Sequence, residues 1–491
     1  GPHALGRARN YGDGGRSHVD DASRRTERAA VSARTFPALL KGMQWGRRRL
    51  EALLFALLLG ILLPLWAARA AVWGRDRLRE ERLFARWRER LHHGLESLRR
   101  ACWPGIRYER AADVWYHVAL TEFFDVLNAT KPPVAAGNEA AGTLVVKLAH
   151  FGDALHVFPM MRALRRQRPG EKIDLLVGPW CEALAQAFRL HDELLVVSPR
   201  LGQFDRGNTA QRRSLVGEVR WLMELRRRRY ERVFSTSTTS LAEVLLMAAL
   251  DPPRWVGAEM PESACEAPTG AVLVPYDSRR YEAERVMELL ELAGGTAEAA
   301  DLFFPLADAD RSAARALLAE ARVAAGAPLA VLAPGAGWPG KQWPAERFAE
   351  IGDRLRRETG FAVVLVGSAG EIELCRSVAA RMREPAASLA GKTSLAQLAA
   401  LLESAALFVG NDSGPMHLAA CFQIPSVVCF GPTVASKWAP RHARARVLQH
   451  EDCSGCVSWH YRASCLHGNR CMKNITLDEV WTAISAVLGK Q

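Results

Sequence analysis

The sequence predicts an α/β protein with two doubly wound, Rossmann-like domains behind a basic N-terminal region. Two observations support this prediction. From residue 143 onward, short β-branched runs alternate with amphipathic segments of helical spacing, a pattern typical of a parallel sheet covered by helices. The alternation starts again at residue 329, after the Gly294-Gly295 pair. Because ligands bind beyond the carboxyl ends of strands in such sheets, the two domains are expected to face a cleft.

The length and charge of the chain limit its class. With 491 residues it is long enough for two or three domains with sizeable cores. The net charge of +12 is uneven, because arginines crowd roughly the first fifth of the chain. This asymmetry predicts an anionic partner for the N-terminal region, with membrane lipid favoured. Nucleic acid is disfavoured, since no zinc finger, RNA-recognition signature or helix-turn-helix pattern is present.

The N-terminal region contains the most hydrophobic stretch of the chain. Residues 1–46 are rich in Arg, Gly and Ser without periodicity, and we expect a disordered basic tail there. Within residues 47–74, the uncharged run Ala52–Ala68 is slightly shorter than the ~20 residues of a full span. Arginines flank this run on both sides, whereas a single span carries positive charge on one side. We therefore expect a membrane anchor over residues 47–74, either a span or a re-entrant segment, and disfavour a buried core helix.

Residues 75–140 are expected to form an amphipathic helical region that ends in a linker. Leucines and aromatic residues recur there at steps of three and four among arginines. A basic helix of this kind can lie on an anionic lipid surface, so lipid contact is expected through residues 47–100. Packing against the following domain is the alternative. Lys131-Pro132-Pro133 marks the linker.

The first α/β domain is predicted to cover residues 141–300 and the second residues 301–491. The strands expected in the first domain are Thr143–Leu148, Ile173–Val177, Leu194–Val197, Arg232–Ser235 and Ala271–Val274. Its expected helices include one that follows Gly152-Asp153 and runs to Arg168, and another over Tyr281–Leu292. The strands expected in the second domain are Leu329–Ala333, Phe361–Val366, Leu407–Val409 and Ser426–Phe430. The helices expected there are Pro344–Arg357, Glu371–Arg381, Leu395–Leu402 and Pro415–Cys421.

The residues suited to chemistry all follow expected strands. They are Gly152-Asp153 in the first domain, and Gly335, Ala336, Gly337, Lys341 and Asp412–His417 in the second. The stretch Gly410–Ala420 predicts a strand end, a loop and a helix start whose free N–H groups suit an anion such as diphosphate. An ordinary capped helix with a surface histidine is the alternative. The absence of a G-x-G-x-x-G or Walker A pattern disfavours dinucleotide enzymes and P-loop kinases.

Three stretches that begin at Val146, Ala333 and Gly410 resemble, in their residues, order and spacing, those of glycosyltransferase family 9, the heptosyltransferases and their relatives, which have the GT-B fold. The first is Val146-Lys147-Leu148-Ala149-His150-Phe151-Gly152-Asp153, with Pro159 six residues after the aspartate. The second is Ala333-Pro334-Gly335-Ala336, continuing to Lys341-Gln342-Trp343-Pro344, and the third is Gly410–Ala420. The resemblance covers the chain from Thr143 to its end and leaves out the first 140 residues.

The resemblance implies transfer of a sugar from a nucleotide-sugar to a saccharide or lipid-linked acceptor with inversion, without cofactor or catalytic metal. It implies that Asp153 is the general base and that Lys341 pairs with phosphate. The alternatives are an N-cap for Asp153 and a solvated side chain for Lys341.

The resemblance also implies a set of substrate-binding residues. Ser413 and Gly414 would donate to the diphosphate, and Asp412 and His417 would order their loop or touch the sugar. Glu371 would accept from ribose hydroxyls, with a surface glutamate as the equal alternative. The full expected set is Gly152, Gly335, Ala336, Glu371, Asp412, Ser413, Gly414, Pro415 and His417.

Four cysteines near the end of the chain are a separate feature. Cys453, Cys456, Cys465 and Cys471 include one C-x-x-C pair, which can bind zinc. The later pair has five residues between its members and is not a zinc knuckle. Similar C-terminal cysteine patterns occur among some relatives, so the resemblance implies a structural role, and zinc, a disulfide and free thiols stay open.

The leading hypothesis from sequence is a membrane-attached glycosyltransferase at the cytoplasmic face of a bacterial inner membrane. Its expected partners are a nucleotide-sugar, a lipid-linked or saccharide acceptor such as one of lipopolysaccharide or cell-surface polysaccharide biosynthesis, and membrane lipid. One alternative is another GT-B enzyme, such as a nucleotide-sugar epimerase. The other is a non-catalytic binding or assembly module. No residue identifies the sugar.

Overall fold

The structure is a computed structural model that describes residues 142–197, 215–236, 241–259, 271–275, 277, 279–450, 465 and 467–489. All of these lie in one compact unit, Phe124–Gln491. The predictions for the tail, the anchor and the amphipathic region fall outside the described residues and stay predictions. Within the described ranges, no helix is both long enough and apolar enough to cross a membrane.

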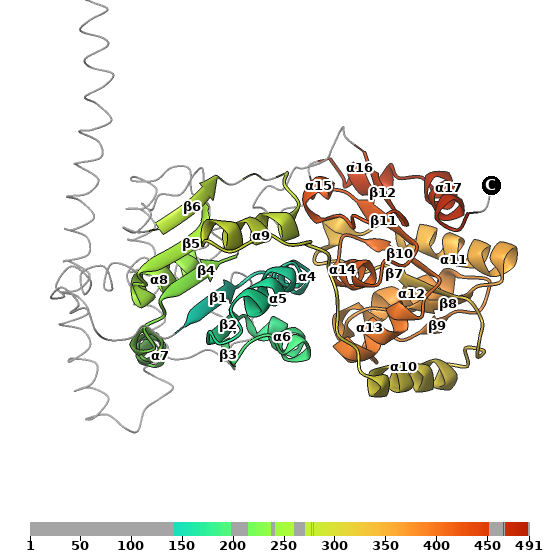
Figure 1. Ribbon diagram of the computed structural model, residues 1–491. Coiled ribbons are helices and arrows are strands. Elements are labelled where there is room, and N and C mark those ends of the chain that lie inside the picture. Colours follow the sequence, from blue (N-terminus) through green and yellow to red (C-terminus); the bar gives the residue numbers. More distant parts are fainter. Residues whose placement is uncertain are drawn as a thin grey trace, which may run out of the picture. The chain divides into compact units, whose positions relative to one another are not determined.

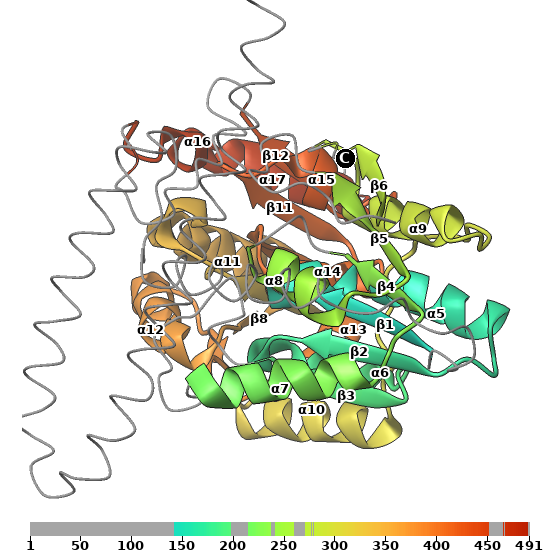
Figure 2. The same cartoon turned by 90° about the vertical axis from the view of Figure 1, so that its left-hand side faces the viewer.

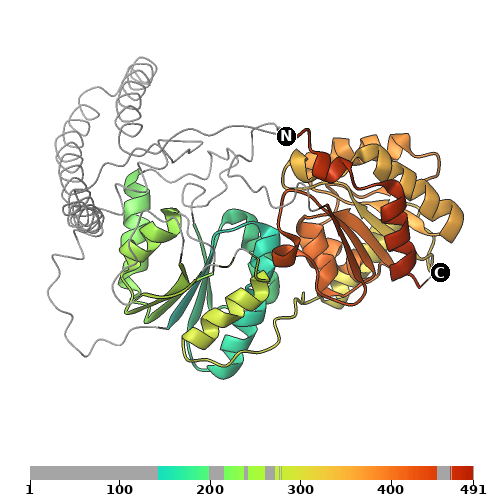
Figure 3. The ribbon, with the colours of Figure 1, turned by 90° about the horizontal axis from the view of Figure 1, so that it is seen from above.

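The first domain is built on a six-stranded parallel sheet. Its strands are β1 (Thr143–Lys147), β2 (Ile173–Val177), β3 (Glu193–Val196), β4 (Arg232–Ser235), β5 (Arg254–Glu259) and β6 (Ala271–Pro275). Its helices are α4 (Phe151–Leu155), α5 (Phe158–Gln167), α6 (Glu182–Phe188), α7 (Leu215–Arg227), α8 (Leu241–Leu250) and α9 (Glu282–Leu292). Helices α7 and α8 pack together on one side of the sheet, and α5 and α9 pack together on the other (Figures 1 and 3).

The second domain repeats this plan. Its strands are β7 (Leu329–Ala333), β8 (Ala362–Leu365), β9 (Ala387–Ser388), β10 (Leu407–Asn411), β11 (Ser426–Phe430) and β12 (Ala445–Gln449). Its helices are α10 (Asp308–Glu320), α11 (Ala345–Thr359), α12 (Ile372–Arg381), α13 (Leu395–Glu403), α14 (Gly414–Cys421), α15 (Ala435–Trp438), α16 (Arg470–Lys473) and α17 (Leu477–Val487).

Both sheets have the same strand order. The first runs β3-β2-β1-β4-β5-β6 and the second β12-β11-β10-β7-β8-β9, with all neighbours parallel. Figure 2 shows β1, β2 and β4 next to one another in the side view. In such a sheet the chain reverses its winding between the first and fourth strands, and ligands bind there. Here these switch points lie between β1 and β4 in the first domain and between β7 and β10 in the second. The predicted site residues other than Glu371 follow β1, β7 and β10.

The observed elements differ from the predicted ones mainly after β1. The sequence predicted a loop at Gly152-Asp153 and one helix to Arg168, but the structure has α4 and α5 with a break between them. Pro159 explains the break. It lies in the first turn of α5, has no N–H to donate, and would clash with the preceding turn of a continuous helix. Strands β5, β9 and β12 were not predicted, and the domain boundaries stay a prediction.

Candidate functional site

The second-domain part of the site is assembled by Asn411, the fully buried last residue of β10. Its side-chain amide donates to the carbonyl of Pro334 at 2.8 Å, and its side-chain oxygen accepts from the backbone N–H of Trp343 at 3.1 Å. Trp343 is itself buried, with its indole N–H donating to the Ile475 carbonyl at 2.9 Å. The loop after β7, which carries Gly335, Ala336 and Lys341, is thus fixed to the end of β10.

Lys341 pairs with Asp412 in this loop assembly. The lysine Nζ lies 2.6 Å from Asp412 Oδ2, and the two side chains are 12% and 7% exposed. The Thr433 hydroxyl donates to the same carboxylate oxygen at 2.6 Å. Burial alone would raise the pKa of Asp412, but Lys341 and His417 outweigh it, and the pKa lies below its usual value. Because an ammonium has three donors, the pairing leaves Lys341 able to bind a phosphate oxygen as predicted.

Helix α14 begins directly beside this ion pair. Ser413 is its N-cap and Pro415 lies in its first turn, as expected from the sequence. However, the Ser413 hydroxyl donates to the Asn411 carbonyl at 3.2 Å and makes no capping bond to the helix. The first-turn N–H groups therefore have no side-chain cap, which suits an anion.

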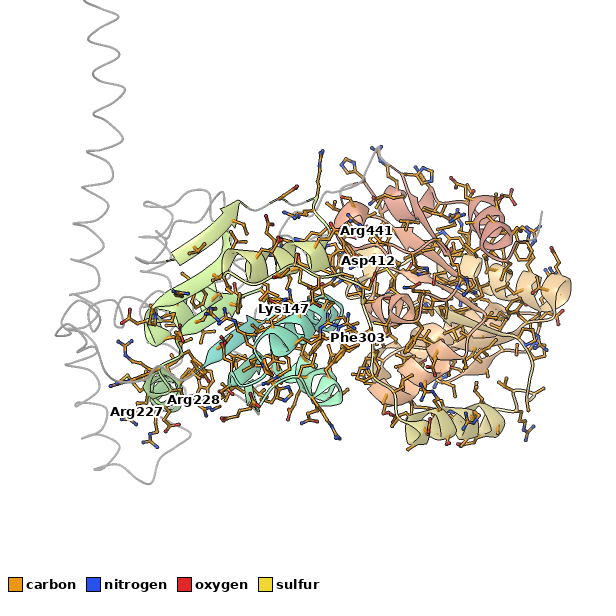
Figure 4. The ribbon with its side chains drawn as sticks, viewed as in Figure 1. Lys147, Arg227, Arg228, Phe303, Asp412 and Arg441 are labelled. Carbon is orange, nitrogen blue, oxygen red and sulfur yellow. The ribbon has the colours of Figure 1, made fainter. Side chains whose placement is uncertain are left out.

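The first and third motifs meet between the domains, because α4 packs against α14. A Cβ added to Gly152 would lie 2.4 Å from the imidazole of His417. A Cβ added to Gly414 would lie 2.7 Å from the ring of Phe151. Each glycine thus makes room for a ring from the other domain. Figure 4 labels Lys147 and Asp412, which belong to the first and second domains.

Asp153 lies in the first turn of α4 and is partly exposed. It caps neither helix, since His150 is the N-cap of α4 and Val157 that of α5. The pKa of Asp153 is raised, chiefly by burial, although the charges of Lys147 and Lys341 act to lower it. The structure thus does not support the N-cap alternative, and it places a carboxylate of raised basicity next to the donor-side loops.

Glu371 has a local partner. Its Oε2 accepts from the backbone N–H and the hydroxyl of Ser368, at 2.7 and 2.8 Å, and caps the short 3-10 helix Ala369–Glu371. The carboxylate also touches the loop after β7, because a Cβ on Gly335 would lie 2.0 Å from Oε1. Glu371 therefore lies at the site edge, and a ribose role stays a prediction.

His417 lies in the contact between the domains instead of on the surface. Its Nδ1 is 3.2 Å from Nε2 of His156, and both rings are buried. Burial lowers the pKa of both histidines, that of His156 far below its usual value. Since one nitrogen must donate and the other accept, at least one ring is neutral, and burial favours the neutral form of both.

Sequence reasoning missed three residues near the site, namely His156, Lys147 and Glu282. The Lys147 ammonium at the end of β1 is buried and lies 3.1 Å from Glu282 Oε1 at the start of α9. The available signal was a lysine inside an otherwise apolar strand, which requires a buried partner.

Metal-binding residues do not gather in the described part of the chain, where no three His, Cys, Asp or Glu side chains are grouped to hold an ion. One Asp-x-Asp triplet, a pattern whose two carboxylates could bind a metal ion, is Asp308-Ala309-Asp310 at the start of α10. Its Asp310 accepts from the Ala307 N–H at 3.0 Å and so caps that helix. Cys465 and Cys471 are thiols, while Cys453 and Cys456 lie outside the described residues.

Two solved structures share this arrangement of two domains. The Escherichia coli ADP-heptose lipopolysaccharide heptosyltransferase II aligns with a TM-score of 0.54 and 22% identity, covering 71% of this chain and 98% of that one. A glycosyltransferase family 9 protein of Veillonella parvula aligns with a TM-score of 0.56 and 23% identity, covering 70% and 96%. The fold is therefore GT-B, with the site where the two switch points meet.

Sequence comparisons narrow the class to a family. The profile of Glycosyltransferase family 9 (heptosyltransferase) matches residues 220–467. Lipopolysaccharide heptosyltransferase 2 of Salmonella typhimurium is 27% identical over 318 residues, which are 62% of this chain and 87% of that protein. Lipopolysaccharide heptosyltransferase 1 of Pseudomonas aeruginosa is 29% identical over 299 residues, 59% of this chain and 78% of that protein. The chain belongs to glycosyltransferase family 9 and is a heptosyltransferase-like glycosyltransferase.

Proposed function

We propose that this glycosyltransferase moves a heptose or a similar sugar from a nucleotide-sugar to a lipid-linked or cell-envelope saccharide, with inversion. The names of its relatives support lipopolysaccharide as the class of acceptor. The observation that carries the proposal is the contact of α4 with α14. It brings α4, which carries Asp153, against α14, whose uncapped start follows the Lys341–Asp412 pair.

The proposed reaction needs a base and positive charge, and we assign these roles to Asp153 and to Lys341 with the start of α14. Asp153 takes the proton of the acceptor hydroxyl while the oxygen of that hydroxyl attacks the anomeric carbon of the donor. The bond from that carbon to the diphosphate oxygen breaks, and the diphosphate leaves from the opposite face, which inverts the configuration. Lys341 and the first-turn N–H groups of α14 stabilise the charge that develops on the leaving group. The proposal includes no cofactor and no catalytic metal.

The proposed location is the bacterial inner membrane, with the catalytic domains on the cytoplasmic side. Nucleotide-sugars are cytosolic, and a lipid-linked acceptor accounts for an anchor. The apolar run within residues 47–74, flanked by arginines, supports attachment.

The direct test is transfer by the purified full-length protein with a panel of nucleotide-sugars and lipopolysaccharide core acceptors. Asp153→Asn should lower kcat by about 100- to 10,000-fold, the usual range for a lost general base. Binding of the nucleoside diphosphate should change little, because the donor loops are untouched. Asp478→Asn, at a carboxylate that is 95% exposed in α17, is the matched control and should keep full activity.

The alternatives predict different results. An epimerase would convert the nucleotide-sugar without any acceptor. A binding module would bind the nucleoside diphosphate without turnover. Unchanged turnover in Asp153→Asn would remove Asp153 as the base.

A further inference from the structure

A buried cluster of charges joins the two domains next to the site. Its centre is Glu282, the first residue of α9, whose side chain is 2% exposed. Within the first domain, Lys147 Nζ lies 3.1 Å from Glu282 Oε1, and Arg285 donates to both carboxylate oxygens at 2.9 and 2.7 Å. Lys147 and Arg285 also donate to the carbonyl of Thr236, just after β4, at 3.1 and 2.6 Å.

The second domain adds one cation to this cluster. Lys437, in α15, places its Nζ 3.6 Å from Glu282 Oε2, with a side chain that is 6% exposed. Burial alone would raise the pKa of Glu282, but Arg285, Lys147 and Lys437 outweigh it and hold the pKa well below its usual value. Glu282 is therefore ionised at neutral pH. The pair of Lys437 with Glu282 forms only while the domains are in contact, because separation would take Lys437 away from this carboxylate, which would keep Lys147 and Arg285.

The segment that carries Lys437 also contacts the site. Thr433 donates to the Asp412 carboxylate, which pairs with Lys341. Trp438 lies edge-on to His156 of the first domain, with ring centroids 5.6 Å apart. Residues 433–438 thus connect the donor loop, the contact between the domains and the cluster around Glu282.

A second ion pair, at the surface, links α9 to Arg441, three residues after α15. Arg441 Nη1 lies 2.6 Å from Glu284 Oε1, with side chains 45% and 46% exposed, and its guanidinium lies 4.4 Å over the Tyr281 ring. Exposed pairs of this kind contribute little, because water and salt screen them. This second pair is therefore a natural control for the buried one.

We propose that Lys437 is a positioning residue, whose ion pair with Glu282 holds the donor domain where the acceptor hydroxyl, the Asp153 carboxylate and the donor can meet. This inference rests on the proposed function for its kinetic consequence. Lys437 makes no contact with substrate in this proposal. It affects the reaction only by holding the two domains in place.

The test compares Lys437→Met with Lys437→Arg and Arg441→Gln in the full-length protein. Lys437→Met should lower kcat by about 10- to 100-fold, since a displacement of about 1 Å has that effect on reacting groups. The affinity for the free nucleoside diphosphate should stay within about threefold, because Lys341 and α14 are unchanged. Lys437→Arg keeps the charge and should recover most of the rate, and Arg441→Gln should match the wild type.

Hydrogen exchange provides a readout that does not need turnover. Lys437→Met should speed exchange in peptides from α4 and α14, whose contact depends on domain placement, while Arg441→Gln should leave it unchanged. If Lys437→Met does not fold, Lys437→Gln, which keeps a polar end, replaces it under the same criteria.

Three results would overturn the inference. The first is a Lys437→Met protein with a kcat near the wild-type value and unchanged hydrogen exchange. The second is a loss of diphosphate affinity in Lys437→Met that equals its loss of kcat. The third is an equal effect of Lys437→Met and Arg441→Gln. If the wild-type protein transfers no sugar from any donor, the proposed function fails. The exchange experiment still decides whether Lys437 holds the domains together.

Discussion

At the scale of single residues, Asp153 is a carboxylate on which burial and nearby charges act in opposite directions. Burial disfavours its ionised form, and the charges of Lys147 and Lys341 favour it. Burial is the stronger influence, so the pKa is raised. Asp412 shows the reverse balance, since Lys341 bonds to it directly and its pKa is lowered. The two aspartates at the site are thus suited to different tasks, one to take a proton and the other to stay ionised.

The raised pKa of Asp153 predicts the pH dependence of the reaction. A general base works only when it is ionised, so activity should be lost as the pH falls through the raised pKa. The acidic limb of the kcat/KM profile should therefore lie above the value of about 3.9 that an unperturbed aspartate would give. The measurement is the pH profile of kcat/KM with saturating acceptor. Diphosphate binding over the same pH range is the control, and an acidic limb at or below the ordinary aspartate value would contradict the prediction.

At the scale of elements, the site depends on how closely α4 approaches α14. The two helices carry a glycine each at the points of contact, and His417 cannot move aside easily because it is buried and bonded to His156. The short helix α4 exists as a separate element because Pro159 starts α5 anew. The break lets the α4 turn, with Asp153 on it, lie against the second domain.

Gly152→Ala tests this close approach. In a helix, alanine is normally favoured over glycine by about 0.5–1 kcal/mol. Here the new Cβ would lie 2.4 Å from the His417 ring, and overpacking of this kind costs about 1–3 kcal/mol. We expect a net loss of folding stability, measured by thermal unfolding. We also expect a loss of kcat, measured by transfer assays, that is larger than the loss of folded protein would cause.

Gly170→Ala is the matched control, because a Cβ there has no neighbour within 4 Å. It should leave stability and kcat near the wild-type values. An active Gly152→Ala protein of wild-type stability would show that the α4–α14 contact is not needed.

The sequence allowed prediction of the elements more fully than of the site contacts. Strands such as Ile173–Val177 and Ser426–Phe430 match their predicted bounds, because buried parallel strands are continuous apolar runs. Arg254–Glu259 was missed, since its charged ends and Gly257 hide the strand pattern. Glu282 and Lys437 were also missed, because 155 residues separate them and only the fold brings them together.

At the scale of the whole molecule, the two domains meet through polar groups that suit neutral pH. The His156–His417 contact requires at least one neutral ring, whereas the Glu282 cluster requires an ionised carboxylate. The surrounding charges and burial favour these states together, since the histidine pKa values and that of Glu282 are all lowered. Both conditions hold together at neutral pH.

The proposed attachment to the membrane makes a prediction for the N-terminal region. Removing residues 1–74 deletes the apolar run and should release the protein from membranes, because we expect residues 75–140 alone to bind only weakly and through their charge. Removing residues 1–46 deletes only the basic tail and should leave the protein in the membrane fraction, which makes it the matched control. The measurement is sedimentation with membranes, before and after a high-salt wash, with diphosphate binding as proof that each variant is folded. If the protein without residues 1–74 still sediments fully after the wash, the anchor must lie in residues 75–140.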